Sequence, residues 1–293
     1  MRIVVTGKTG QIAQSLLERG PAFGANVAAL GRPEFDLAAP LHAEELLAAA
    51  KPDLIISAAA YTAVDKAESD REVAYAVNAV GPRALAQAAA TLGVPVLHVS
   101  TDYVFDGSKA EPWREEDTPR PLTVYGASKL AGEEAVLAAS PDNVVVRVGW
   151  VYSPFSANFA KTILRLAGER DTLRVVADQT GGPSSALDIA DGLLAMARNI
   201  ASEPERGNLK GLFHMSPEGV ATWADFAEAI CGWLGETRGR NVNVERITTA
   251  DYPTPARRPA NSRLDSSRLA ALHGIRLPHW RTSLPAVLGR LAP

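Results

Sequence analysis

The sequence predicts a doubly wound α/β fold, in which helices cover both faces of a parallel sheet, with a smaller second lobe toward the C-terminus. Three observations predict it: short apolar runs, helical periodicity between them, and a glycine-rich turn directly after the first run. Apolar runs without polar alternation are typical of parallel strands that are buried on both faces. Their regular alternation with helices predicts right-handed βαβ units.

The first half of the chain carries the regular part of this pattern. We expect strands at 2–6, 26–30, 53–57, 95–100 and 143–149, and helices at 11–19, 41–50, 71–92 and 125–139. Gly93 and Pro95 follow the third of these helices, which is typical of a helix C-terminus.

The second half is less regular. We expect helices at 158–168, 188–200, 223–234 (capped by Thr222) and 283–291, and a short strand at 211–215. The stretch 252–259 is rich in Pro and Arg and cannot form a regular helix. This change from a regular to an irregular pattern of elements near residue 150 predicts two domains. The first is a dinucleotide-binding domain over 1–150, completed by returning segments within 156–215. A substrate-binding lobe is expected over 216–293 with parts of 150–185.

The composition restricts the partners that the chain can bind. Its 293 residues are 46% hydrophobic and 22% charged, and a net charge of −3 provides no basic field for nucleic acid or anionic lipid. No apolar run approaches the ~20 residues of a membrane helix, and the N-terminus enters a strand pattern without a signal-peptide pattern. We therefore expect a cytoplasmic protein that binds neither nucleic acid nor membrane.

Metal binding is not expected. The single cysteine, Cys231, excludes an internal disulfide and a cysteine-based zinc site. Histidines 42, 98, 214, 273 and 279 show no metal-ligand spacing, so we interpret them as structural or surface residues. We interpret the acidic run 115–117 as a solvated loop. Trp223 and Trp233 fit the core face of their helix.

The glycine-rich turn predicts a dinucleotide site. Gly7 and Gly10 allow a tight turn. The helix that follows has Gln11 and Ile12 as its first residues, and its N-terminus offers free N–H groups and a positive dipole end to a pyrophosphate. Because Ala13 replaces the third glycine of the usual motif, an ordinary strand–helix turn is the alternative. At the end of the second strand Arg32 stands where an acid would bind a ribose 2′-hydroxyl. Arg32 thus predicts NADPH rather than NADH, with a solvated surface arginine as an equal alternative.

Two further segments predict carbonyl chemistry at the same edge of the sheet. Tyr125 and Lys129 are four residues apart on a helix and share a face. An ammonium beside a phenol lowers the phenol pKa, which suits Tyr125 as a general acid for a carbonyl oxygen. Thr101 and Asp102 end an apolar strand, where ligands bind in doubly wound sheets.

Seven segments spread over the chain carry recognisable motifs. They are Thr-Gly-x-x-Gly-Gln (6–11), 58–68, Ser-Thr-Asp-Tyr-Val-Phe-Asp-Gly (100–107), Tyr-Gly-x-Ser-Lys (125–129), 149–152, 158–162 and Pro-Thr-Pro-Ala-Arg-Arg-Pro-x-Asn-Ser-Arg-Leu (253–264). Together they resemble the extended short-chain dehydrogenase/reductases and, within them, the dTDP-4-dehydrorhamnose reductase family. The last motif carries the narrower resemblance, because general sugar-nucleotide epimerases share only the early ones.

The resemblance implies NADPH-dependent reduction of the C4 ketone of dTDP-4-dehydro-L-rhamnose, with NADH as the alternative cofactor. It implies that Tyr125 protonates the sugar O4, that Thr101 hydrogen-bonds the same oxygen, and that Lys129 binds the nicotinamide ribose. The implied cofactor contacts also include Gly7, Gly10, Gln11, Ile12, Asp36, Leu37, Ala60, Tyr61 and Thr62. The implied substrate contacts include Asp102, Trp150, Asn158, Arg257, Asn261 and Arg263. For the arginines a surface loop is the alternative to a diphosphate site.

Two other functions stay open. One is a different extended short-chain enzyme, such as a sugar-nucleotide epimerase or dehydratase. The other is a non-catalytic, reductase-like subunit that binds NADP and regulates a partner enzyme, although the complete set of Tyr125, Lys129 and Thr101 favours catalysis. Some family members form magnesium-bridged homodimers. Ser15 stands where their carboxylate is expected, so the sequence argues against magnesium and leaves a homodimer open.

Overall fold

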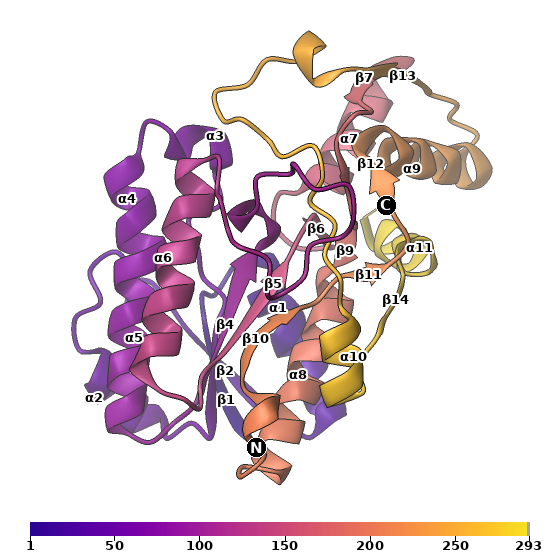
Figure 1. The fold of residues 1–293 in the computed structure, drawn as a ribbon. Coiled ribbons are helices and arrows are strands. Elements are labelled where there is room, and N and C mark those ends of the chain that lie inside the picture. Colours follow the sequence, from indigo (N-terminus) through magenta and orange to yellow (C-terminus); the bar gives the residue numbers. More distant parts are fainter. Residues whose placement is uncertain (292–293) are drawn as a thin grey trace.

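The computed structural model describes residues 1–291 and is built on a six-stranded parallel sheet (Figure 1). In sheet order the strands are β10 (Gly211–His214), β5 (Val144–Val148), β4 (Val96–Thr101), β3 (Leu54–Ser57), β1 (Arg2–Thr6) and β2 (Asn26–Leu30). All neighbouring strands run parallel. The chain goes from β1 outward to β2 and returns across β1 to β3. The strand order therefore reverses between β1 and β3, which is where doubly wound folds bind ligands.

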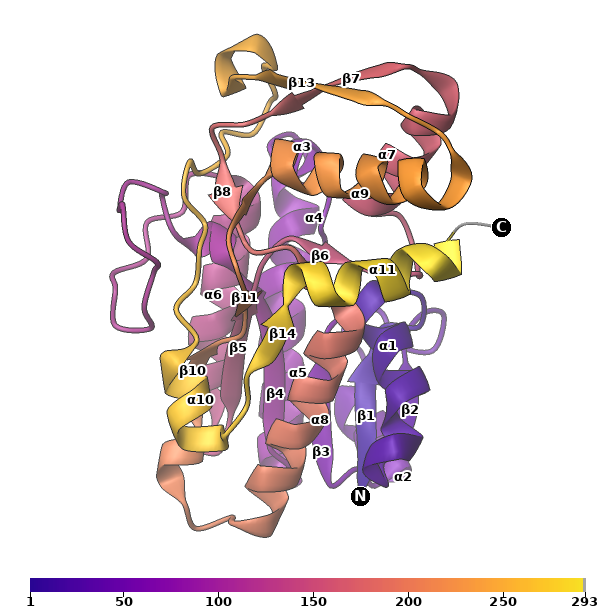
Figure 2. The same cartoon turned by 90° about the vertical axis from the view of Figure 1, so that its right-hand side faces the viewer.

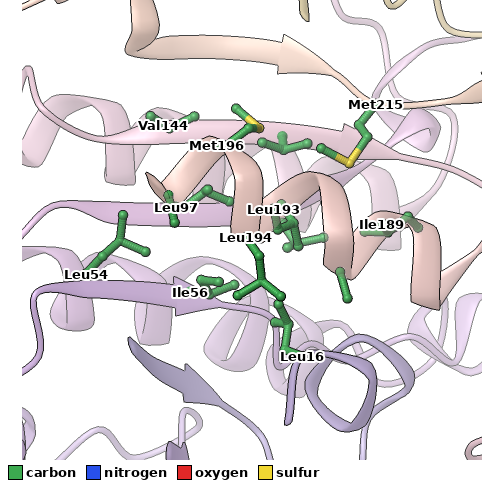
Figure 3. Packing of buried hydrophobic residues seen from close by; sticks show 14 of the residues in the cluster. Leu16, Leu54, Ile56, Leu97, Val144, Ile189, Leu193, Leu194, Met196 and Met215 are labelled. Carbon is green, nitrogen blue, oxygen red and sulfur yellow. The ribbon is translucent and has the colours of Figure 1, made fainter. Parts of the chain in front are cut away.

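Helices cover both faces of the sheet, as the sequence predicts (Figure 1). One face carries α2 (Ala43–Ala50), α4 (Arg71–Tyr75), the π-helical turn η2 (Ala76–Val80), α5 (Gly81–Thr91) and α6 (Val124–Ala139). The other carries α1 (Gln11–Arg19), α8 (Ala186–Ser202) and α10 (Ser267–His273). Figure 3 shows Leu193 and Leu194 of α8 directed toward Leu16 of α1 and toward the sheet residues Ile56 and Leu97. The doubly wound α/β fold is confirmed.

The helix predicted over 71–92 is not uniform. It consists of α4, the π-helical turn η2 and α5, which follow one another without a break in the chain. Pro82 has no N–H to offer the carbonyl of Asn78, four residues before it, so a regular α-helical bond is impossible there. The wider π-helical turn covers this position, and such turns are frequent at functional sites.

A separate group of elements lies above the carboxyl ends of the sheet (Figure 2). It comprises α7 (Phe159–Glu169), α9 (Trp223–Arg238), α11 (Trp280–Leu291) and the parallel pair β7 (Thr172–Val176) and β13 (Asn243–Ile247). Its buried side chains form a hydrophobic cluster of their own, which includes Phe226 and Trp280. Thr222 caps α9 in a capping box with Asp225, as predicted for Thr222, whereas β7 and β13 were not predicted.

The remaining elements are short. They are α3 (Val64–Ala67), β6 (Val151–Tyr152), β8 (Thr180–Gly181), β9 (Ser184–Ser185), β11 (Pro217–Glu218), β12 (Ala221–Thr222), β14 (Leu277–His279) and the turns η1 (Gly20–Phe23), η3 (Asp102–Val104), η4 (Gly207–Leu209) and η5 (Thr249–Asp251). Within residues 1–291 none of the helices combines the length and the apolar character needed to cross a bilayer.

Candidate active site

A cleft of about 1130 Å³ opens where the strand order reverses. Its walls are the segments that follow β1, β2, β3, β4 and β5, together with residues of α6, α7 and α9. Among the predicted site residues, those in the cleft wall are Gly7, Gly10, Gln11, Ile12, Arg32, Asp36, Leu37, Ala60, Tyr61, Thr62, Thr101, Asp102, Tyr125, Lys129 and Trp150. The fold therefore brings most of the predicted site together.

The floor of the cleft is the turn between β1 and α1. Gly7 has a φ of +93°, which favours glycine, and a Cβ there would lie 3.2 Å from the Cβ of Ala59. At Gly10 a Cβ would meet nothing within 4 Å, so the cleft is open above it. No side chain caps the N-terminus of α1, which leaves its first N–H groups free for an anion. These residues fit the pyrophosphate of a dinucleotide.

The end of β2 forms one end of the cleft. Arg32 is exposed there, and Asp36 accepts a hydrogen bond from the backbone N–H of Ala38 at 2.9 Å. Lys8, which sequence reasoning did not single out, also lines this end and forms an ion pair with Glu34. Two cations therefore lie within the cleft wall at the end where a 2′-phosphate is expected.

Asn78 fixes the segment that follows β3. Its side chain accepts a hydrogen bond from the backbone N–H of Tyr61 at 2.8 Å and donates one to the carbonyl of Tyr61 at 3.1 Å. Its amide also donates to the hydroxyl of Ser128 in α6 at 3.0 Å. Asn78 is fully buried and lies in the π-helical turn η2. Sequence reasoning missed it, because nothing in its local pattern marks an asparagine inside a helix as a support for a distant loop.

Tyr125 and Lys129 lie in the first turns of α6, which Thr123 caps by accepting a hydrogen bond from Gly126 N at 3.0 Å. Tyr125 is half-buried at the cleft, and its ring meets that of Tyr103 edge to face at 5.9 Å. Lys129 is buried, and its Nζ donates to the carbonyl of Val99 at 2.7 Å.

The expected effect of Lys129 on Tyr125 is wrong. Burial raises the pKa of Tyr125 to about 12, while the hydroxyl of Thr101 acts in the opposite direction. Burial also lowers the pKa of Lys129 to about 8, against the field of Glu133. The ammonium is hydrogen-bonded on the β4 side, and the Tyr125 pKa is set by burial of the phenol, by Thr101 and by Asp102. Tyr125 therefore keeps its proton at neutral pH and can donate it.

Asp102 is buried beside these residues. Its Oδ1 accepts from the Thr101 hydroxyl at 3.0 Å, and its Oδ2 has no hydrogen-bond partner within residues 1–291. Burial raises the pKa of Asp102 to about 6, with the hydroxyls of Ser262 and Thr101 acting in the opposite direction. A Cβ at Gly149 would lie 2.5 Å from Oδ2. Oδ2 is buried and lies against Gly149, so this unpaired acceptor is an internal cost of the ionised carboxyl, although Asp102 as a residue lines the cleft.

Trp150 and Trp223 form an aromatic wall at the other end. Their rings stack with centroids 3.5 Å apart, and Trp150 Nε1 donates to the Ser262 hydroxyl at 3.0 Å. Trp150 has a φ of +50°, and a Cβ at Gly181 would collide with its ring, so this indole is held tightly. Trp223 lies partly in the core, as predicted, and also lines the cleft, which was not predicted.

Four predicted substrate residues do not line the cleft: Asn158, Arg257, Asn261 and Arg263. Asn158 caps α7, and Asn261 donates to the carbonyls of Lys109 and Glu111 at 2.7 and 2.9 Å. Arg263 donates to Asn261 Oδ1 at 2.9 Å, and Arg257 is exposed. The polar contacts of Asn158, Asn261 and Arg263 hold loops in place, and the part of all four residues in substrate binding stays a prediction.

The next arginine, Arg258, makes a contact that was not predicted. It forms an ion pair with Asp65 at 2.7 Å, and the backbone N–H of Ala256 donates to the same carboxylate at 3.2 Å. The Pro-rich segment is thereby tied to the start of α3.

Within residues 1–291 no three His, Cys, Asp or Glu side chains are grouped so as to hold a metal ion. Ser15 is fully buried and donates to the carbonyl of Gln11 at 2.9 Å. The interpretation of the acidic run as a solvated loop is wrong for Glu115, which is half-buried and accepts from the backbone N–H of His214 at 2.9 Å.

Comparison with known proteins gives consistent results. The family model described as "RmlD substrate binding domain" matches residues 1–292. A dTDP-4-dehydrorhamnose reductase of Sinorhizobium fredii is 51% identical over 97% of this chain and 95% of its own length. The crystal structure of a dTDP-4-dehydrorhamnose reductase from Clostridium acetobutylicum covers 99% of both chains at 35% identity, with a TM-score of 0.89. That of the Bacillus anthracis enzyme in complex with NADP covers 98% of both chains at 32% identity, with a TM-score of 0.87.

Proposed function

Because the chain belongs to the family described by the RmlD substrate-binding domain, we propose that it reduces the C4 ketone of dTDP-4-dehydro-L-rhamnose with NADPH, giving dTDP-L-rhamnose. The observation that carries the proposal is the convergence of Tyr125, Thr101 and Lys129 in the same cleft as the glycine turn and the uncapped N-terminus of α1. A fold by itself would not support an activity, whereas this set of side chains does.

The cofactor would be held by the floor and one end of the cleft. Gly7, Gly10 and the N-terminus of α1 would bind the pyrophosphate, and Arg32 would bind the 2′-phosphate of NADPH. Lys129 would bind the nicotinamide ribose. When bound, the cofactor supplies the hydride. Tyr125, Thr101 and Trp150 line the same cleft, so a cofactor bound there would lie beside the residues that would bind the sugar.

Tyr125 would donate the proton. Its raised pKa keeps the phenol protonated near neutral pH, and the sugar O4 becomes a strong base as negative charge develops on it. The hydroxyl of Thr101 has one proton, which Asp102 Oδ1 accepts in the structure, so this hydroxyl would turn from Asp102 to donate a second hydrogen bond to the same oxygen. Asp102 and Trp150, which both line the cleft, would contact the substrate. The part of the chain built around α7 and α9 would form the substrate-binding lobe, and a homodimer stays compatible with the proposal.

The test is Tyr125→Phe, with Tyr75→Phe as the matched control because Tyr75 lies on α4 outside the cleft wall. We expect Tyr125→Phe to bind NADPH as the wild type does and to lose about two or more orders of magnitude in turnover. Binding is followed by nicotinamide fluorescence, turnover by loss of NADPH absorbance, and the product by NMR. Near-normal turnover in Tyr125→Phe would remove Tyr125 from the mechanism. Turnover without stoichiometric loss of NADPH would point to an epimerase or dehydratase, and absence of turnover in the wild type to a non-catalytic subunit.

A further inference from the structure

Two acceptors of β4 bind the ammonium of Lys129 on the side that faces the sheet. Its Nζ lies 2.7 Å from the carbonyl of Val99 and 3.2 Å from Nε2 of His98. An ammonium has three N–H donors in tetrahedral positions. Two of them are used on the β4 side, and Lys129 also lines the cleft. Within residues 1–291, the third N–H is the donor of this buried ammonium that has no hydrogen-bond partner.

The contacts of His98 determine which of its two ring nitrogens carries the proton. An ammonium can only donate, so Nε2 must be the unprotonated nitrogen that accepts. The proton is then on Nδ1, which lies 3.0 Å from the hydroxyl of Ser57 in β3. His98 is fully buried, and burial together with the charge of Lys129 holds its pKa well below the ordinary value of 6.5. The imidazole therefore stays neutral, and Nε2 stays an acceptor, at every pH near neutrality.

The packing leaves room for this arrangement. Gly132 of α6 faces His98, and a Cβ there would lie 3.6 Å from Nε2. Of the two acceptors of Lys129, the Val99 carbonyl is backbone and cannot be removed by substitution. Within residues 1–291, His98 is the side chain that hydrogen-bonds to this ammonium.

We propose that His98 is a positioning residue of the reductase site: as a neutral imidazole backed by Ser57, it holds Lys129 so that one N–H points into the cleft. The proposal rests on the proposed function for the identity of the ligand that receives this N–H, namely the ribose of the nicotinamide cofactor. The chain of hydrogen bonds from Ser57 through His98 to Lys129 does not depend on the proposed function.

The hydrogen bond to His98 affects the pKa of Lys129. A buried ammonium that loses one of its two acceptors is less stable relative to the neutral amine, so its pKa falls below the value of about 8. A hydrogen bond to a charged group corresponds to a shift of about one pKa unit or more. The charged and titratable groups around Lys129 are His98 of β4, Tyr125 and Glu133 of α6, Arg147 of β5, which pairs with Glu133, and Asp102 at the end of β4.

The test compares His98→Leu with His98→Gln. Leucine removes the acceptor, whereas the glutamine amide can accept from Lys129 and donate to Ser57. Lysine labelled with ¹³C at Cε reports the titration in the protein without cofactor. The chain has only seven lysines, and Lys129→Met assigns the signal. We expect the pKa of Lys129 to fall by about one unit in His98→Leu and to stay near the wild-type value in His98→Gln.

Two kinetic readouts accompany the titration. In His98→Leu we expect weaker NADPH binding and an alkaline limb of the kcat/KM profile that moves to lower pH, with recovery in His98→Gln. If His98→Leu does not fold, His98→Asn takes its place, because its shorter amide does not reach the ammonium. An unchanged Lys129 pKa in the variant without an acceptor, or a shifted one in His98→Gln, would overturn the proposal. A shifted pKa in a protein that reduces no 4-keto sugar would instead overturn the proposed function and leave the positioning role standing.

Discussion

Asp102→Asn should make the protein more stable at neutral pH while it impairs substrate turnover. The ordinary pKa of an aspartate is 3.8, and burial raises that of Asp102 to about 6, with the Ser262 and Thr101 hydroxyls acting in the opposite direction. Folding at pH 7 therefore forces a carboxylate into a place that prefers the protonated acid. At about 1.4 kcal/mol per pKa unit, this costs the wild type about 3 kcal/mol of unfolding free energy.

The sign of the pH dependence follows from the two pKa values. Between about pH 4 and pH 6 the folded state binds more protons at Asp102 than the unfolded state, so stability falls as the pH rises through this window. Asparagine does not titrate. The stability of Asp102→Asn relative to the wild type should thus grow by about 2 kcal/mol between pH 4.5 and 7.5. The hydrogen bonds of the new amide add a constant offset and do not change this slope.

The assay is urea unfolding of both proteins, without ligand, at several pH values in this range. Asp117→Asn is the control without a slope in this range. Hydrogen bonds from the backbone N–H of Arg114 and from Lys109 lower the pKa of Asp117 below its ordinary value of 3.8, so this carboxyl is ionised in both the folded and the unfolded state above pH 4.5, and the stability of the variant relative to the wild type should not change with pH. A difference between wild type and Asp102→Asn that does not change with pH would refute the argument. It would mean that the carboxyl has a solvent contact or a partner that satisfies its charge.

Two further predictions concern the cofactor and the packing of α6. Arg32→Ala should raise the Michaelis constant for NADPH and leave that for NADH unchanged, and an unchanged ratio of the two constants would assign Arg32 to the surface. Gly132→Ala should destabilise the protein by about 1–3 kcal/mol or more in urea unfolding, because its Cβ would lie 2.1 Å from a backbone carbonyl of the π-helical turn η2. The matched control is Gly168→Ala on the exposed side of α7, where a Cβ meets nothing within 4 Å; it should be neutral or stabilising, and equal losses in both variants would contradict the packing argument.

The regular half of the fold was predictable because most of its strands are buried on both faces, the exception being the edge strand β2. Val144–Val148 is buried at every position, and such runs stand out in a sequence. By contrast, β7 alternates buried and exposed residues, and most of β13 is exposed, so neither forms an apolar run. The interruption at η2 depends on one missing N–H, that of Pro82, inside a pattern that otherwise reads as helix.

The same contrast applies to the site. Tyr125, Lys129 and Thr101 could be placed at one cleft, because helix periodicity and the ends of parallel strands determine where such residues lie. Arg257 and Arg258 could not be told apart, because periodicity does not set side-chain direction in an irregular Pro-rich segment. The raised pKa of Tyr125 could not be predicted from the sequence, because burial of the phenol decides it and residue spacing does not.

The return of α8 and β10 to the sheet bears on how the protein is made. The face covered by α8 buries Ile189, Leu193 and Leu194 against strands from the first half, and β10 pairs with β5. A nascent chain that has reached residue 150 therefore lacks α8 and α10, two of the three helices on one face, and also an edge strand. Domains generally fold as units during synthesis. We expect the six-stranded sheet to complete its folding only after about residue 215 has emerged from the ribosome, and chaperones to bind its incompletely covered face until then.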